Sequence, residues 1–251
     1  MKIKICGLRR LEDIFYANEA QPDYVGFILT QGFRRSITMD TAREFKNRLD
    51  PNIKAVGVFV NEPVDRIVEF LEEGIIDMAQ LHGQESEEDI VYIKAATGKP
   101  VIKVVRFVKP DDMQTEERKA MQTEKRKAMQ TEEQRNALAE EQNRAKMMNR
   151  YSVEAWLDSA ADYLLFDSGT GTGKTFDWSV LTEVLADYGG TLPKEFFLAG
   201  GISAENIDEA YESLSPYAVD LSSSVETDGV KDLDKMKLAV SIARNYAREP
   251  K

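Results

Sequence analysis

The chain has 251 residues, of which 42% are hydrophobic, and it carries a formal net charge of −11. This composition is typical of a folded globular protein, and so acidic a chain lacks the basic face that broad affinity for nucleic acid requires. No run approaches the roughly 20 apolar residues that cross a bilayer, and the opening MKIKICGLRR resembles a strand rather than a secretory signal. We therefore expect a cytoplasmic protein that binds neither nucleic acid nor membrane.

Eight short runs rich in β-branched and aromatic residues alternate with segments that carry apolar residues at helical spacing. The runs predict strands at 2–6, 24–28, 54–59, 78–82, 101–107, 163–167, 196–201 and 218–224. The other segments predict helices at 11–20, 40–49, 63–73, 87–97, 178–187, 203–213 and 231–247. Strands that alternate with helices form a parallel sheet, and eight of them close most simply as a (β/α)8 TIM barrel. An open, doubly wound sheet is the alternative.

Residues 111–150 interrupt this rhythm between the fifth and sixth strands. They contain two near-identical octads, MQTEERKA and MQTEKRKA, followed by a partial third copy. The composition favours helix, but an eight-residue period rotates by about 80° per repeat, so the methionines form no continuous coiled-coil seam. We expect one barrel domain over residues 1–251 with a charged helical insertion at 111–150. The insertion is either an inert solvated segment, a lid or an oligomerisation arm.

Two candidate proton-transfer groups stand at strand ends, where the reactive side chains of a barrel lie. Side chains alternate along a strand, so Lys4 and Cys6 share one face of the first strand. If Ile3 and Ile5 face the helices, that face points into the barrel mouth, where the lysine favours the thiolate. Asp167 ends the sixth strand. A lone cysteine is more often structural and a lone aspartate is as often a cap, so the functional interpretation depends on their conjunction.

The seventh and eighth strands end in small residues that suit a phosphate group. Gly200 and Gly201 follow the seventh strand, and Ser223 and Ser224 follow the eighth. The loops after these two strands are the common phosphate site of a TIM barrel, and backbone amides there bind an anion without net positive charge.

The chain offers few groups for metal or nucleotide chemistry. Cys6 is the only cysteine and His82 the only histidine, so neither a disulfide nor a Cys/His zinc site can form, and we expect no metal. The segment GTGTGKT at 169–175 is similar to a P-loop, but Ser168 stands where the first glycine is needed. An NTP-binding protein is therefore only an alternative.

Taken in order, the motifs resemble those of phosphoribosylanthranilate isomerases over nearly the whole chain outside 111–150. They are KICG at 4–7, VGF at 25–27, VFVN at 58–61, QLHG at 80–83, LFD at 165–167, GTGKTFDW at 171–178, LAGGI at 198–202, DLSSSVE at 220–226 and GVKD at 229–232. The resemblance implies conversion of N-(5-phosphoribosyl)anthranilate to 1-(2-carboxyphenylamino)-1-deoxyribulose 5-phosphate in tryptophan biosynthesis. We expect acid–base catalysis without a cofactor, on a small phosphorylated substrate, by a monomer or homodimer.

The resemblance also implies roles for single residues. Cys6 corresponds to the general base and Asp167 to the general acid. Arg35 corresponds to the arginine that holds the anthranilate carboxylate, and Asp220 to an aspartate near the anthranilate amine, while His82 lines the site without carrying a proton. The phosphate ligands correspond to Gly200, Gly201, Ser223 and Ser224.

Two departures from the family pattern are expected to alter substrate affinity. Ser224 replaces the usual glycine, and Phe33-Arg34-Arg35 replaces Ser-Pro-Arg. The remaining alternatives are a barrel enzyme acting on a related sugar phosphate and a barrel that has lost its activity and serves as a binding or assembly subunit.

Overall fold

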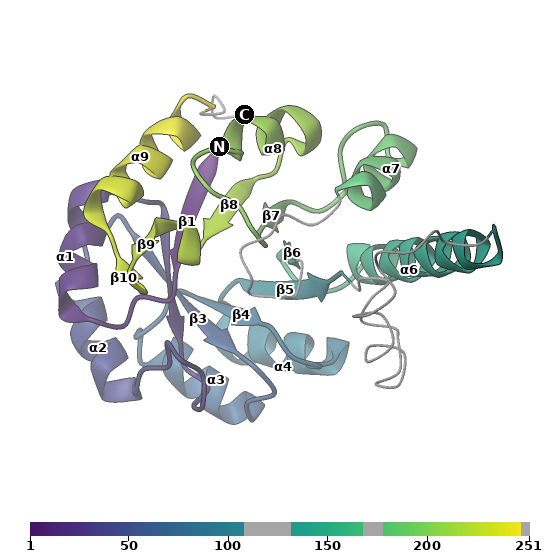
Figure 1. Ribbon diagram of the computed structural model, residues 1–251. Coiled ribbons are helices and arrows are strands. Elements are labelled where there is room, and N and C mark those ends of the chain that lie inside the picture. The colour runs from purple at the N-terminus through teal and green to yellow at the C-terminus, as the bar shows by residue number, and fades with distance from the viewer. Residues whose placement is uncertain (108–131, 168–177, 247–251) are drawn as a thin grey trace.

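A computed structural model describes residues 1–107, 132–167 and 178–246. Eight parallel strands form a closed barrel with the helices around its outside (Figure 1). The strands are β1 Lys2–Cys6, β2 Tyr24–Ile28, β3 Lys54–Phe59, β4 Met78–Leu81, β5 Val101–Arg106, β6 Tyr163–Asp167, β7 Phe196–Leu198 and β8 Ala218–Leu221. They pair in chain order, and β1 also pairs with β8, which closes the sheet. The predicted TIM barrel is confirmed, and the open sheet is excluded.

Most of the helices start and end close to the predicted positions, and the side chains of Thr38, Ser86 and Asp232 cap the starts of three of them. They are α1 Leu11–Ala20, α2 Met39–Arg48, α3 Val64–Glu72, α4 Glu87–Thr97, α6 Glu132–Leu157, α7 Ser179–Asp187, α8 Ile207–Leu214 and α9 Leu233–Arg244. Ser86 and Asp89 form the capping box that the sequence predicts at the start of α4. None of the helices in the described part of the chain is long and apolar enough to span a membrane.

Helix α8 begins later than predicted, at Ile207 rather than near Ser203. The Asn206 side chain accepts a hydrogen bond from the Ser203 amide at 2.8 Å and donates one to the Gly201 carbonyl at 3.0 Å. These bonds give the backbone of the β7–α8 loop an alternative to helix. The loop therefore stays open at the carboxyl end of β7.

Aromatic side chains close the barrel at the amino ends of its strands. The Tyr24 and Tyr217 hydroxyls are 2.7 Å apart, and the rings of Tyr163 and Tyr217 lie 5.1 Å apart. The Tyr24 ring also packs edge-on against Phe197 at 5.5 Å. This packed interior leaves the carboxyl end of the barrel as the open end.

Helix α6 extends past the predicted end of the insertion and belongs partly to the barrel. Ala145, Asn149, Val153 and Leu157 are buried at four-residue spacing, which makes one continuous face. This face packs beside β5 and α7, so the last residues of 111–150 lie in the helical layer. Residues 108–131, including the first two octads, lie outside the described residues. The expectation for the insertion as a whole, and for one domain over 1–251, stays a prediction.

The chain after β8 also differs from the expected strand. The strand ends at Leu221, and a 3-10 helix, η2 Ser223–Val225, follows. A short antiparallel hairpin, β9 Glu226–Thr227 and β10 Val230–Lys231, comes next and was not predicted. Its turn places Asp228 and Gly229 at positive φ, which allows two strands of two residues each to pair.

Candidate active site

A cavity of about 850 Å³ opens at the carboxyl ends of the barrel strands. Nine of the residues that the sequence singled out line it: Cys6, Arg35, His82, Asp167, Gly200, Gly201, Asp220, Ser223 and Ser224. Lys4, which was also expected to face the mouth, is fully buried and is not among the lining residues. Gln80, Ser203, Asn206 and Ser222 also line the cavity and were given no function. The barrel thus brings together side chains that are up to 218 positions apart in the chain.

Cys6 ends β1 and is half-buried at the cavity wall. Gly26 on β2 stands beside it, and a Cβ at that position would lie 2.6 Å from the Cys6 Sγ. Only glycine leaves room for the thiol there. The Ser222 hydroxyl donates to the Cys6 carbonyl at 3.1 Å and fixes the backbone on the other side.

The pKa of the Cys6 thiol depends on two opposing effects, burial and the charge of Lys4. Burial raises the pKa of Cys6, and the charge of Lys4 only partly offsets the rise. The Lys4 ammonium is fully buried and 2.7 Å from the Asp220 carboxylate, whose negative charge adds to the rise in the Cys6 pKa. The Lys4 charge does favour the thiolate, as expected, but the opposing effect of burial is larger. The balance of these effects favours the protonated thiol in the free protein.

Asp220 has one carboxylate oxygen available to a ligand. Its Oδ2 accepts from Lys4, whereas its Oδ1 is buried and has no hydrogen-bond partner within the described ranges. Burial raises the pKa of Asp220, and the Lys4 charge opposes that rise. A buried acceptor without a partner is costly, so a ligand N–H directed at Oδ1 would be bound favourably.

His82 connects the wall of the cavity to Asp167. Its Nε2 lies 3.4 Å from the Asp167 Oδ2, and its Nδ1 lies 3.3 Å from the Gln80 Nε2. If the amide donates to Nδ1, the ring proton is on Nε2 and faces Asp167. The Arg106 guanidinium donates to the His82 carbonyl at 3.0 Å and holds this segment in place.

The loops after β7 and β8 are joined to each other. Gly200 and Gly201 have φ values of 79° and 82°, in the left-handed region that favours glycine. The Ser224 hydroxyl donates to the Ile202 carbonyl at 2.7 Å, so the side chain that replaces the usual glycine bridges the two loops. The P-loop-like segment 169–175 lies outside the described residues, and the expectation that it binds no nucleotide stays a prediction.

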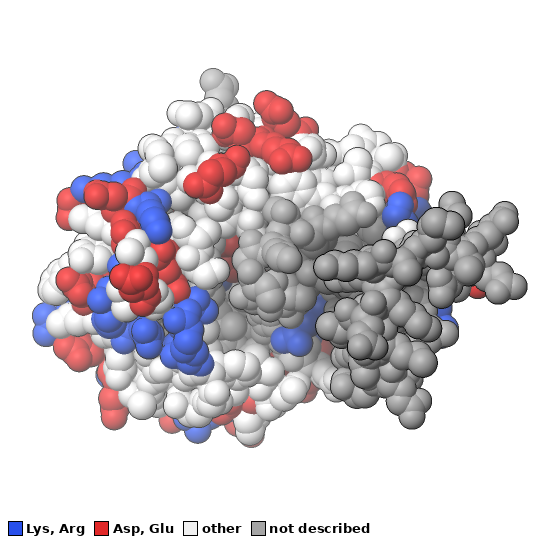
Figure 2. Space-filling view, in the orientation of Figure 1, with Lys and Arg blue, Asp and Glu red and all other residues white. Residues whose placement is uncertain are grey.

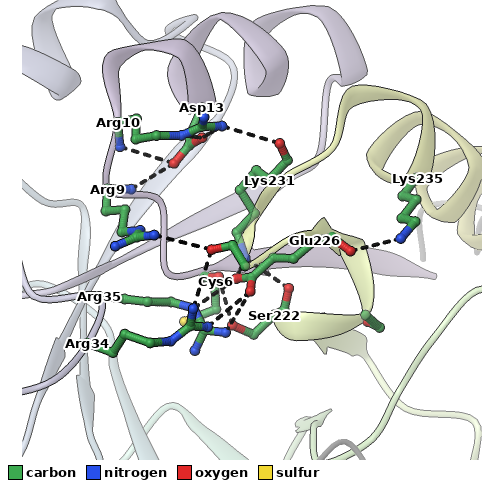
Figure 3. Close-up of polar contacts among 12 residues, drawn as sticks. Cys6, Arg9, Arg10, Asp13, Arg34, Arg35, Ser222, Glu226, Lys231 and Lys235 are labelled. Atoms are coloured by element: carbon green, nitrogen blue, oxygen red, sulfur yellow. Dashed lines mark hydrogen bonds and ion pairs between the residues drawn. The ribbon is translucent and has the colours of Figure 1, made fainter.

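Arg35 is held at the rim of the cavity by Glu226 (Figure 3). Its Nε lies 2.8 Å from Glu226 Oε1 and its Nη2 3.0 Å from Oε2. Arg34 and Lys231 bind the same carboxylate at 3.1 and 2.9 Å. Although burial opposes ionisation, Arg35 and Lys231 lower the pKa of Glu226 to about 2. Gly7 makes room for this arrangement, because a Cβ there would lie 2.5 Å from the Arg35 Cδ.

Sequence analysis missed Glu226 and Lys231. Both belong to the hairpin of β9 and β10, whose two-residue strands are too short to give a periodic signal. Their only signal is that they stand within the motifs DLSSSVE and GVKD. Figure 2 shows Lys and Arg side chains gathered on the side of the mouth where the hairpin lies.

The closed barrel and this mouth define a class of protein. A thiol, a carboxylate and an arginine surround one cavity, with two small-residue loops after the seventh and eighth strands. This is the arrangement of a (β/α)8-barrel enzyme that acts on a small anionic substrate by proton transfer.

Comparison with known proteins identifies the family within this class. The family model described as N-(5'phosphoribosyl)anthranilate (PRA) isomerase matches residues 3–130 and 128–241, two stretches that meet inside the repeat. An N-(5'-phosphoribosyl)anthranilate isomerase of Endomicrobium trichonymphae is 40% identical, over 97% of this chain and 98% of its own. The chain belongs to this family and is an isomerase.

Solved structures of the family have the same fold. The phosphoribosyl anthranilate isomerase of Thermus thermophilus is 29% identical with a TM-score of 0.69, over 98% of this chain and 100% of its own. Another, 28% identical with a TM-score of 0.68, was solved in complex with reduced 1-(o-carboxyphenylamino)-1-deoxyribulose 5-phosphate. It aligns over 98% of this chain and 99% of its own.

Proposed function

We propose that the chain converts N-(5'-phosphoribosyl)anthranilate to 1-(2-carboxyphenylamino)-1-deoxyribulose 5-phosphate in tryptophan biosynthesis, with Asp167 as general acid and Cys6 as general base. The observation that carries the proposal is the single cavity in which both residues meet the loops after β7 and β8. The family membership supports the substrate class, and the residues that line the cavity support the acid–base chemistry.

The first step opens the ribose ring. Asp167 donates a proton to the ring oxygen, the C1–O bond breaks, and the nitrogen lone pair forms a protonated Schiff base. His82, 3.4 Å from Asp167, orients the carboxyl group. The free Oδ1 of Asp220 accepts the N–H of the anthranilate nitrogen and stabilises the positive charge that develops there.

The second step moves a proton from C2. The ionised Cys6 sulfur takes the C2 proton, the C–H electrons form a C1=C2 double bond, and the Schiff-base nitrogen is neutralised. The resulting enol gives up its hydroxyl proton and gains one at C1 to become the ketone. No net oxidation occurs, so proton transfers suffice, and each typically contributes about 10²- to 10⁴-fold.

The remaining contacts hold the substrate in place. The Arg35 guanidinium binds the anthranilate carboxylate, with Arg34 on the outer side of the same rim. Backbone amides of the two loops bind the phosphate, and the relevant residues are Gly200, Gly201, Ser223 and Ser224. The mechanism uses no metal and no organic cofactor.

The wider setting of the enzyme is part of the same proposal. We propose a cytoplasmic monomer or homodimer whose partner is its small phosphorylated substrate and not nucleic acid. The net charge of −11 supports the last point. The structure of a Thermotoga maritima relative, 27% identical, is described as that of monomers generated from a dimeric isomerase.

An activity assay that follows anthranilate fluorescence tests the proposed reaction. Cys6→Ala and Asp167→Asn should each lower kcat at least about 100-fold with little change in KM, because each removes a proton transfer made in the transition state. Arg35→Ala should act mainly on KM. Asp187→Asn, on the exposed end of α7, is the matched control and should leave both constants unchanged.

Two outcomes would count against this assignment. Absence of turnover by the unmodified protein would reject the substrate, and near-normal kcat in Cys6→Ala would show that another cavity residue is the base.

A further inference from the structure

Three cations surround one carboxylate at the rim of the cavity. Glu226 binds Arg34, Arg35 and Lys231, and its side chain is only 6% exposed. Lys231 is 1% exposed, so this ion pair is inside the protein rather than on its surface. One negative charge leaves two positive charges unbalanced in this cluster. The carboxylate of a ligand would offset one of them.

The geometry of Arg35 shows which of its donors remain for such a ligand. A guanidinium has five N–H donors in a rigid plane, and Glu226 takes the one on Nε and one on Nη2. Within the described ranges, no other hydrogen bond of this guanidinium is seen. Glu226 therefore fixes the plane of Arg35 from one edge, and the Nη1 and Nη2 edge is left for a carboxylate, which such a fork binds with two parallel bonds.

The same network fixes Arg35 relative to Cys6 (Figure 3). Lys231 donates not only to Glu226 but also to the Ser222 carbonyl at 2.8 Å, and the Ser222 hydroxyl donates to the Cys6 carbonyl at 3.1 Å. The Lys235 ammonium donates a hydrogen bond to the Glu226 backbone carbonyl at 2.8 Å. A continuous chain of hydrogen bonds thus connects Arg35 at the rim to the backbone carbonyl of Cys6.

We propose that Glu226 is a positioning residue that, with Lys231, sets Arg35 to recognise an aryl carboxylate at a fixed place relative to Cys6. The inference rests on the proposed function, because it assigns the carboxylate of that substrate to Arg35. The hairpin of β9 and β10, which carries Glu226 and Lys231, would therefore select substrates that have the carboxylate. A substrate analogue that lacks the carboxylate gains nothing from this hairpin.

Glu226→Gln tests the proposal, because glutamine keeps the shape but loses the charge and one acceptor oxygen. We expect KM to rise about tenfold while kcat stays within about threefold, because the carboxylate is bound equally well in the ground state and in the transition state. Glu226→Asp keeps the charge but shortens the reach, and should restore part of the affinity.

Direct binding of two probes separates positioning from general damage. One is reduced 1-(o-carboxyphenylamino)-1-deoxyribulose 5-phosphate, and the other is the same compound without the carboxylate. Measured by calorimetry, Glu226→Gln should weaken the first about tenfold and the second less than twofold. Equal weakening of both probes, or of neither, would overturn the proposal.

Two further variants test whether the effect is specific to the carboxylate cluster. Glu73→Gln removes a carboxylate paired with Arg43 in the helical layer and should leave both probes unaffected. If Glu226→Gln fails to fold, as judged by circular dichroism, Lys231→Met takes its place and should show the same carboxylate-selective loss. Turnover by the unmodified protein is measured in parallel, so failure of the proposed reaction is distinguished from failure of the positioning role.

Discussion

At the scale of single residues, the decisive effect is the burial of Cys6. Burial raises its pKa, and the charge of Lys4, which is paired with Asp220, offsets only part of that rise. A thiol is alkylated only as its thiolate, so the rate at which Cys6 of the free enzyme is alkylated increases as pH rises. We expect this rate to keep increasing beyond the ordinary thiol pKa of about 8.5, because burial raises the pKa of Cys6.

Alkylation rates of this lone cysteine by iodoacetamide, from about pH 6 to about pH 10, provide the measurement. A profile that is flat from neutral pH upward would show that the base titrates lower than the buried thiol does. The Lys4→Met variant removes the cation that partly offsets the effect of burial. It should therefore raise the pKa of Cys6 further and shift the rise of the profile to still higher pH.

At the scale of elements, α6 joins the barrel through one narrow face. Val153 is fully buried on that face, whereas Tyr151 on the same helix is 74% exposed. Val153→Ala should lower the free energy of unfolding by about 1–3 kcal/mol through lost burial and the cavity left behind. Tyr151→Ala should change it by less than about 0.5 kcal/mol.

Urea unfolding monitored by circular dichroism measures both values. Equal effects of the two substitutions would mean that the helix is not anchored through the face seen here. A large loss for Val153→Ala would also show that a deletion reaching residue 150 removes part of the barrel, since Ala145 and Asn149 share the buried face.

At the scale of the whole molecule, the composition restricts the chemistry. The chain contains one histidine and one cysteine, too few for a Cys/His metal site, and the proposed proton transfers need no metal. Turnover should therefore survive exhaustive dialysis against EDTA. Loss of activity that a divalent ion restores would contradict this expectation and require carboxylate ligands.

Much of the fold could be predicted because its signals are local. The strands β1, β2, β3 and β6 have the predicted bounds, since short β-branched runs between capped helices leave few other assignments. The start of α8 and the hairpin after β8 were not predicted. Side-chain hydrogen bonds from Asn206 and a turn at Asp228 decide them, and neither changes the hydrophobic pattern.

The sequence by itself determined the barrel and its motifs, because strand order and side-chain alternation place strand ends such as Cys6 and Asp167 together. The resemblance to a known family added other residues of the mouth, such as Arg35 and Asp220. Only the tertiary structure decided the electrostatics of that mouth. Whether Cys6 ionises depends on how deeply it is buried and on whether Asp220 neutralises Lys4, and the placing of Arg35 depends on Glu226, 191 positions away. These are contacts between segments remote in sequence, and charge energies depend on distance and burial, which no local pattern encodes.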